Sequence, residues 1–373
     1  MSFNVLFITG SLENEASGPF LSLNELVDQF INYGISVQII GDITTKSKDF
    51  STKYHNSITI KVRNIFNGSP HFSLGIWHAL KSVNRPDIVI FHTPWNLNNL
   101  VIYKWCIKEN IPYVISIRGS LSEFALQVKK IKKYFMINFL FKKMLKNCAF
   151  FHALNATEYK DTKKMFPNKK VLIIPNGINK VLTTRNYLGF KTVTYLGRIF
   201  EGKGIKELLI AWNKVHEKYP TWHLNIAGPD NNEFASTLKR YVIENNLEKS
   251  VSFLGPVYDK HKTSLFEHSS FLILPSFSEG MPMAPLEAMM YGVPILCTAQ
   301  SNLDFLRESN GGIIIDYPDP NLIELGLLEM IAMGDEALSK MGENARAYCE
   351  ENLSWDVITE KFINYLKKES VYE

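Results

Sequence analysis

The sequence predicts an α/β protein made of two doubly wound domains, each built on a parallel sheet. Short apolar runs typical of buried strands alternate with segments of helical periodicity in both halves of the 373 residues. Such alternation is typical of parallel sheets that helices cover on both faces. A turn-rich stretch at 175–190 interrupts it once. We therefore place a domain boundary there, between residues 1–180 and residues 181–354.

The first half begins with a strand, a helix and a second strand. Leu23, Leu26 and Phe30 recur at helical spacing between two apolar runs, which is the pattern of a βαβ unit. The strands expected in this half are 4–9, 35–40, 88–91, 113–117, 149–154 and 171–174, and the helices are 21–33, 76–83, 100–108 and 157–165.

Two glycines flank the first strand-to-helix loop. Gly10 ends the strand and Gly18 lies in the loop. Because glycine has no Cβ, a ligand could approach the backbone closely at both positions. An ordinary role in a turn explains them equally well, and both interpretations stay open. The spacing is not G-x-G-x-x-G, so the dinucleotide-binding fingerprint is absent.

Polar side chains follow two buried strands of the first half. His92 follows one strand, with Trp95 and Asn96 just beyond it, and Arg118 follows the next. A histidine at a strand end could face a ligand cleft, although a lone histidine can equally be structural. Arg118 could bind an anionic acceptor; a surface arginine is the alternative.

One segment of the first half is strongly basic. No acidic residue occurs from 124 to 157, and aromatic and aliphatic residues are interleaved with lysines in this segment. The lysines expected to face a membrane are Lys129, Lys130, Lys132 and Lys133. Anionic lipid would contribute about 1 kcal/mol per lysine near its surface. The alternative is a helix that packs in the core and exposes its lysines. Nucleic acid is not expected, because no recognised binding module accompanies the lysines.

The second half repeats the alternation. The strands expected here are 191–196, 223–226, 251–254, 271–274 and 293–296, followed by 313–315. The helices expected are 205–219, 234–245, 286–291, 322–333, 336–351 and 355–368.

Two carboxylates lie around the loop after the strand 271–274. Glu279 follows the strand end, and we place Glu287 in the first turn of a helix that Pro285 begins. The backbone N–H groups between them lead into that helix N-terminus, which is a ready site for an anion. The residues of this stretch are Gly280, Met281, Pro282, Met283 and Ala284, and all of them except the proline have a backbone N–H. Carboxylates around an anion site suit a nucleotide sugar, which is anionic in the middle and hydroxyl-rich at both ends. The alternative is a pair of solvated surface glutamates.

Two cations follow the first strand of the second half. Arg198 comes directly after that strand, and Lys203 stands between two glycines just before a helix. Both can therefore reach phosphates above the helix N-terminus, although ordinary surface cations are the alternative. Val257 and Tyr258 follow a later strand and could cradle a nucleotide base; Tyr258 could also be a surface aromatic.

Composition limits the other classes of function. A formal net charge of +4 is too small to indicate nucleic acid by itself, and the four cysteines have no C-x-x-C spacing, so we expect reduced thiols in a cytoplasmic protein. No segment has the about 18 apolar residues that a membrane span needs, and the first residues do not have the pattern of a secretory signal. No Asp-x-Asp occurs; such a carboxylate pair would chelate a metal ion on a diphosphate, so we expect no metal. We expect no cofactor either.

The loop after 271–274 resembles the E-x7-E motif of retaining group 1 (GT4) glycosyltransferases, with Glu279 and Glu287 as its two glutamates. The stretch from Gly197 to Gly204 resembles the G-R…K-G motif of the same family. The resemblance implies the GT-B fold, in which two Rossmann-like domains face each other across a cleft. It also implies that the last helix crosses back, so that 355–373 completes the first domain.

The first half resembles a narrower group within that family. His92, Trp95 and Asn96 form an H-x-x-W-N stretch, and Arg118 begins an R-G pair. Both resemble stretches that enzymes of bacterial surface-polysaccharide synthesis place on the acceptor side. The resemblance implies that His92 lines the junction of donor sugar and acceptor.

Residues and resemblance together predict an enzyme that moves a sugar from a UDP- or GDP-linked donor to a hydroxyl of a glycan acceptor. Arg198 and Lys203 would stabilise the charge on the departing diphosphate. The resemblance implies that Glu287 binds ribose, that Glu279 binds the donor sugar, and that configuration is retained. The expected acceptor is a lipid-linked oligosaccharide at the inner face of the cytoplasmic membrane. The alternatives are a nucleotide-sugar epimerase or phosphorylase, and a non-catalytic partner that binds nucleotide or membrane.

Overall fold

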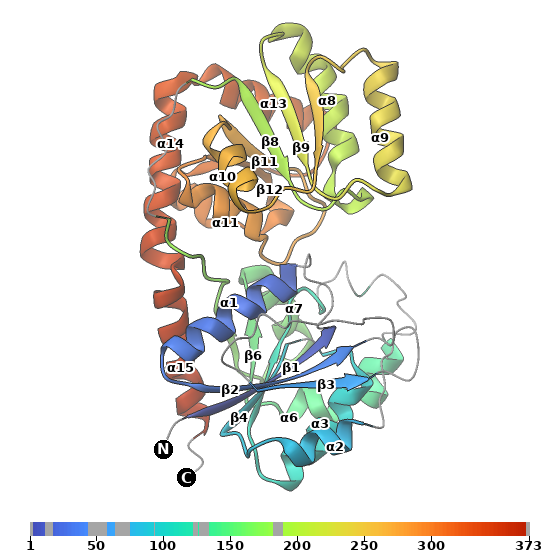
Figure 1. Cartoon of the computed structure of the whole chain (residues 1–373), viewed down its shortest axis with the longest axis vertical. Helices are drawn as coiled ribbons and strands as arrows, with labels where there is room; N and C mark the ends of the chain where they lie inside the picture. The colour runs from blue at the N-terminus through green and yellow to red at the C-terminus, as the bar shows by residue number, and fades with distance from the viewer. Residues whose placement is uncertain are drawn as a thin grey trace. The chain divides into compact units, whose positions relative to one another are not determined.

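The computed structural model describes residues 3–11, 18–43, 58–63, 75–92, 94–121, 126, 134–181 and 189–370. These residues belong to two compact units (Figure 1). One unit spans Met1–Gly177 together with Trp355–Glu373, and the other spans Ile178–Ser354. Each unit has its own sheet, so each is described by itself.

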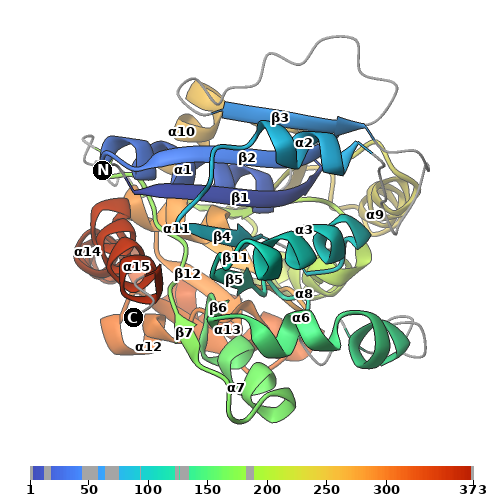
Figure 2. The same ribbon diagram turned by 90° about the horizontal axis from the view of Figure 1, so that it is seen from below.

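The N-terminal unit contains a seven-stranded sheet in the order β3-β2-β1-β4-β5-β6-β7, and Figure 2 shows these strands side by side in that order. Every strand pair is parallel. The strands are β1 (Asn4–Ser11), β2 (Ser36–Ile43), β3 (Ile58–Arg63), β4 (Ile88–Phe91), β5 (Tyr113–Ser116), β6 (Phe150–Ala153) and β7 (Val171–Ile173). The helices are α1 (Gly18–Asn32), α2 (Ile76–Ser82), α3 (Leu97–Lys108), η1 (Met136–Leu140), α6 (Lys142–Asn147), α7 (Ala156–Met165) and α15 (Trp355–Ser370).

Alternate side chains of the interior strand β1 pack into two separate cores. Val5 and Phe7 join the core that α1 and α15 complete, whereas Leu6 and Ile8 join the core under α2, α3 and α6. Successive side chains of a strand point to opposite faces, so a strand buried on both faces reads as a continuous apolar run. The apolar runs of the sequence therefore reflect a sheet with helices on both sides.

The last helix returns to the N-terminal unit, as the resemblance implied. The Trp355 indole donates a hydrogen bond to Glu25 of α1 over 2.7 Å. The ring of Phe362 lies edge-on to that of Phe30, with centroids 5.8 Å apart. The helix thus completes the core of a unit whose other elements lie far away in the sequence.

The C-terminal unit contains a six-stranded parallel sheet in the order β10-β9-β8-β11-β12-β13. The strands are β8 (Thr192–Leu196), β9 (His223–Ala227), β10 (Val251–Gly255), β11 (Phe271–Leu274), β12 (Ile295–Thr298) and β13 (Gly312–Ile315). The helices are η2 (Glu201–Lys203), α8 (Ile205–Lys218), α9 (Glu233–Glu244), α10 (Asp259–Glu267), α11 (Met283–Met290), η3 (Ala299–Ser301), α12 (Phe305–Ser309), α13 (Pro320–Ala332), α14 (Gly334–Tyr348) and η4 (Cys349–Leu353).

Both sheets confirm the predicted doubly wound α/β architecture. In each, the strand order reverses once along the chain: between β1 and β4 in the first sheet, and between β8 and β11 in the second. Open α/β sheets bind ligands at such a switch point, just outside the carboxyl ends of the strands. Each unit therefore carries one position at which a ligand site is expected.

Some predicted boundaries were wrong. We expected Pro285 to begin the helix after β11, but α11 begins at Met283, with Pro282 in an extended conformation at its N-cap. Pro285 is tolerated because the first N–H groups of a helix have no partner within it.

The four cysteines are buried and free of disulfides.

Candidate functional site

The candidate site lies where the loops after β8 and β11 meet. The two strands are neighbours, with Val193 opposite Phe271, and both loops leave from the carboxyl ends of their strands. This position is the switch point of the second sheet. Parallel neighbours thus bring together two segments that the sequence separates by almost eighty residues, since Lys203 and Glu279 are 76 residues apart.

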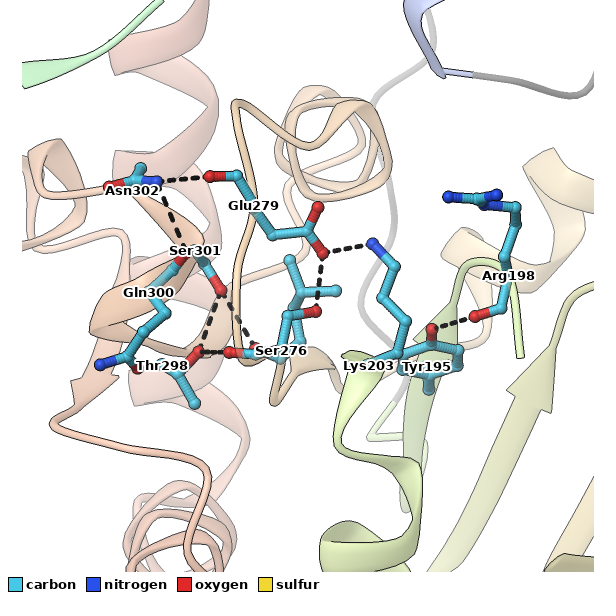
Figure 3. Close-up of polar contacts among 10 residues, drawn as sticks. Tyr195, Arg198, Lys203, Ser276, Glu279, Thr298, Gln300, Ser301 and Asn302 are labelled. Atoms are coloured by element: carbon cyan, nitrogen blue, oxygen red, sulfur yellow. Dashed lines mark hydrogen bonds and ion pairs between the residues drawn. The ribbon is translucent and has the colours of Figure 1, made fainter. Parts of the chain in front are cut away.

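Lys203 and Glu279 form an ion pair across the switch point. The ammonium group donates a hydrogen bond to Oε1 of the carboxylate, and the side chains are only 14% and 10% exposed. The Ser276 hydroxyl donates to the same oxygen over 2.7 Å. Figure 3 shows the Glu279 side chain reaching from its loop toward both partners. A pair this deeply buried leaves an uncompensated charge when either partner is removed.

Gly204 explains how the two loops come so close. Its φ is +65°, and a Cβ built on it would lie 1.9 Å from the carbonyl oxygen of Pro275. Just before it, Gly202 accepts a hydrogen bond from the Phe277 N–H over 3.1 Å. Only glycine allows both the left-handed backbone and this backbone-to-backbone approach. The glycine of the predicted K-G pair therefore sets the position of Lys203.

Arg198 lies on the same loop but outside the ion pair. Its guanidinium carbon stands 5.1 Å from the centroid of the Phe200 ring, and Lys203 Nζ stands 5.8 Å from the same centroid. In Figure 3 the Arg198 side chain stands clear of Glu279, while its backbone carbonyl accepts a hydrogen bond of 2.9 Å from the Tyr195 hydroxyl. Burial, and then the negative charge of Glu279, hold the pKa of Tyr195 well above its usual range. The neutral phenol thus fixes the start of the loop.

A third loop, after β12, holds the backbone of Glu279 on both sides. The Glu279 N–H donates to the carbonyl of Gln300 over 3.0 Å, and the Asn302 side-chain amide donates to the Glu279 carbonyl over 2.6 Å. The Thr298 hydroxyl donates to the carbonyl of Ser276 over 2.6 Å. Sequence reasoning missed these residues. The signal available was their place at or just after the end of β12, which lies next to β11 and ends at the same edge of the sheet.

Glu287 lies farther along α11 than we expected. The prediction that it falls in the first turn was wrong, because the helix begins at Met283 and its first turn holds no acidic residue. Its Oε1 accepts a hydrogen bond from Lys262 Nζ over 3.0 Å. Sequence reasoning also missed Lys262, which lies on α10. Among the described residues, no side chain caps the N-terminus of α11, so its first amides keep the orientation that favours an anion.

The remaining donor-side predictions are Val257, Tyr258, Gly10 and Gly18. Val257 and Tyr258 follow the edge strand β10, and Tyr258 is exposed at the N-cap of α10. Their contact with a nucleotide base stays a prediction. Gly10 lies within β1, and Gly18, predicted to lie in the loop, is instead the first residue of α1.

The acceptor-side residues lie at the carboxyl edge of the first sheet. His92 follows β4 and is buried, and its backbone N–H donates to the Ile8 carbonyl over 2.8 Å. The Trp95 indole donates to the Ser120 carbonyl over 3.1 Å, and Asn96 caps α3 by accepting from the Asn98 N–H. These contacts give Trp95 and Asn96 structural roles, and their contact with an acceptor stays a prediction.

The basic segment is only partly described. Lys129, Lys130, Lys132 and Lys133 lie outside the described residues. Beyond them, Phe141 and the α6 residues Met144 and Leu145 are buried in the core, while Tyr134, Phe135, Phe139 and Leu140 are exposed. The exposed lysines of α6 are Lys142, Lys143 and Lys146. Within the described residues, no helix combines the length and hydrophobicity of a membrane span.

Two family matches together cover most of the chain. Residues 18–181 match Glycosyltransferase Family 4, and residues 184–348 match Glycosyl transferases group 1. The chain belongs to the group 1 (GT4) family of glycosyltransferases. The second match contains both predicted donor motifs, so the ion pair of Lys203 and Glu279 lies in the family's group 1 domain.

Curated relatives are also glycosyltransferases. An uncharacterized glycosyltransferase of Haemophilus influenzae is 29% identical over 43% of this chain and 45% of its own length. A GDP-mannose:cellobiosyl-diphosphopolyprenol alpha-mannosyltransferase of Xanthomonas oryzae pv. oryzae is 27% identical over 39% of this chain and 40% of its own length. The chain spans about half the length of the first curated relatives it matches.

Solved structures agree on the fold. HepE of Anabaena, solved in complex with UDP and glucose, superposes with a TM-score of 0.77 over 98% of this chain and 100% of its own, at 15% identity. At this level of identity the likeness concerns the fold. It confirms the GT-B architecture that the resemblance implied.

Proposed function

We propose that the protein transfers a sugar from a nucleoside diphosphate sugar to a hydroxyl group of a glycan acceptor, with retention of configuration. The observation that carries the proposal is the ion pair of Lys203 and Glu279 at the switch point of the second sheet. It places a cation and a carboxylate side by side at the position where an α/β sheet binds its ligand. A sugar diphosphate needs both, one for phosphate and one for hydroxyl groups.

The cations would act on the diphosphate. Negative charge grows on the leaving diphosphate as its bond to the sugar breaks, and fixed cations stabilise that charge without rearranging. Lys203 is held in place by its contact with Glu279, and Arg198 stands over the Phe200 ring on the same loop. The uncapped N-terminus of α11 adds backbone amides with a favourable dipole.

The carboxylates would bind sugar hydroxyls. Glu279 is held by Ser276 through its side chain and by Asn302 through its carbonyl, so its remaining oxygen would meet the donor sugar in a fixed direction. Glu287 would bind the ribose. Each carboxylate contacts a lysine, Lys203 or Lys262. Donor binding would replace part of these contacts with contacts to phosphate and hydroxyl groups.

The acceptor we propose is a lipid-linked oligosaccharide of surface-polysaccharide synthesis. The name of the Xanthomonas relative specifies a diphosphopolyprenol acceptor. The exposed aromatic residues Tyr134, Phe135 and Phe139 lie in a stretch of the chain without acidic residues. Aromatic side chains beside lysines suit the interface of an anionic membrane. His92, Trp95 and Asn96 would line the acceptor side.

The test is a screen of nucleotide sugars for donor hydrolysis and for transfer to lipid-linked acceptors. With the donor found, Lys203→Ala is expected to lower turnover by about 10²–10³-fold, the range for losing one group that stabilises developing charge. Lys206→Ala is the matched control, because Lys206 is exposed on α8 just beyond the loop. Unchanged turnover in Lys203→Ala, or rapid epimerisation of the donor without acceptor, would contradict the proposal.

A further inference from the structure

Arg118 has an unusual backbone at the carboxyl edge of the first sheet. It follows β5 with a φ of +47°, and Gly119 follows with a φ of +74°. A left-handed conformation is uncommon for a long side chain and persists where the surroundings enforce it. Such residues cluster at ligand sites. The conformation turns the chain at the end of β5.

Among the described residues, the hydrogen-bond partners of the guanidinium are neutral side chains. Nη1 donates to the Ser22 hydroxyl over 2.9 Å and to the Asn176 side-chain oxygen over 3.1 Å. A guanidinium has five N–H donors, and these two bonds use both hydrogens of Nη1. The three donors that remain are one on Nε and two on Nη2. Nε is buried and has no hydrogen-bond partner among the described residues.

Among the described residues, no acidic side chain forms a hydrogen bond or an ion pair with this cation. Glu158 attracts it, but its two oxygens accept hydrogen bonds from the N–H groups of Gly119 and Leu154, over 2.5 and 2.8 Å. Burial, and then the charge of Arg118, lower the pKa of His152 to about 3, so the imidazole is neutral. Burial also lowers the pKa of Arg118 to about 10, which still leaves it charged at neutral pH.

We propose that Arg118, positioned by Ser22 and Asn176, binds an oxyanion of the acceptor, either a phosphate or a carboxylate group. The Nε–H and one Nη2–H point in parallel and form the fork that matches two oxygens of such a group. An oxyanion there satisfies the buried Nε donor and neutralises the cation at once. Calling the ligand the acceptor rests on the proposed function; the oxyanion site itself rests on Arg118.

The test measures binding of inorganic pyrophosphate, inorganic phosphate and acetate to the full chain by calorimetry. Lys203→Ala serves as the background, because it weakens the second place at which phosphate is expected. In that background, pyrophosphate or acetate is expected to bind, and adding Arg118→Gln to weaken the binding about 10- to 100-fold. Arg85→Gln is the matched control, because Arg85 is an exposed arginine whose Nη2 donates to the Glu109 carbonyl.

The probes separate the sources of the oxyanion. Binding of the phosphates alone indicates a phosphate-bearing acceptor, and binding of acetate indicates a carboxylate on the glycan. Binding that Arg118→Gln leaves unchanged, or no binding in the Lys203→Ala background, overturns the site.

Arg118→Lys, which keeps the charge but loses the fork, is expected to bind with intermediate affinity. It serves as the second variant if Arg118→Gln does not fold. If Lys203→Ala leaves UDP and GDP binding unchanged while Arg118 still governs pyrophosphate, the proposed function fails and the oxyanion site stands.

Discussion

The side-chain amide of Asn302 donates a hydrogen bond to the backbone carbonyl of Glu279, with 2.6 Å between Nδ2 and O. Asn302 has a φ of +57°, a left-handed conformation that asparagine tolerates better than most residues. The bond joins the loop after β12 to the loop after β11 (Figure 3). Asn302 is therefore a positioning residue for the carboxylate that we assign to the donor sugar.

Asn302→Gly should lower transfer about two- to tenfold, because it removes a hydrogen bond of about 0.5–1.5 kcal/mol while glycine keeps the positive φ. We expect the loss mainly in kcat, with KM for the nucleotide nearly unchanged, since the diphosphate contacts stay. Steady-state kinetics measure the split. Asn310→Gly is the matched control, because Asn310 has a φ of +51° at the end of α12. Equal losses in the two variants would show that the effect is structural.

Glu279→Gln should separate sugar recognition from phosphate binding. The variant keeps a partner for the Ser276 hydroxyl but loses the charge that holds Lys203. We expect transfer to fall by about 10²-fold or more, while the free nucleoside diphosphate binds at least as tightly as before, because Lys203 no longer exchanges one charged partner for another. Calorimetry with UDP and GDP measures the affinity. A parallel loss of nucleotide affinity and transfer would contradict this division of roles.

Gly204→Ala should unfold the protein more easily and reduce transfer. The new Cβ would meet the Pro275 carbonyl at 1.9 Å and require a left-handed alanine, so we expect a loss above about 1 kcal/mol in the free energy of unfolding. Gly34→Ala is the control for backbone strain alone, because Gly34 has a φ of +74° with no atom within 4 Å of the new Cβ. Denaturant unfolding and kinetics should show a larger stability loss for Gly204→Ala, and a loss of transfer for it alone.

Phe135→Ser with Phe139→Ser should weaken binding to anionic lipid vesicles. The two rings stack with centroids 5.4 Å apart and are 56% and 70% exposed. Burying two such side chains at an interface contributes about 1.5–3 kcal/mol each, which corresponds to at least a tenfold loss of affinity. Vesicle co-sedimentation with anionic and neutral lipid measures it. Trp77→Ser is the control, because Trp77 is equally exposed on α2. Unchanged sedimentation of the double variant would refute membrane docking by this surface.

The sequence was sufficient for the architecture and for the residues nearest the switch point. Lys203 and Glu279 follow apolar runs of the length and composition of buried parallel strands, which predicts that their loops leave from the same edge of one sheet. The motifs then identified the loops. The same logic located His92 and Arg118 after β4 and β5 in the first sheet.

The supporting residues could not be predicted in this way. Asn302 acts through a side-chain amide to a carbonyl, and nothing in its neighbours along the chain specifies that partner. Lys262 is one of many lysines, and its pairing with Glu287 depends on how α10 lies against α11. The start of α11 was misplaced because two prolines stand near it, and either can occupy the first turn.

The central claim is that a sugar diphosphate lies at the switch point of the second sheet, between the cations of the β8 loop and the amides of α11. A crystal structure with the nucleoside diphosphate sugar that the screen identifies tests it most directly. We predict that phosphate oxygens lie within hydrogen-bonding distance of Lys203 Nζ and the Arg198 guanidinium, with the sugar against Glu279. A diphosphate bound away from these side chains would contradict the account.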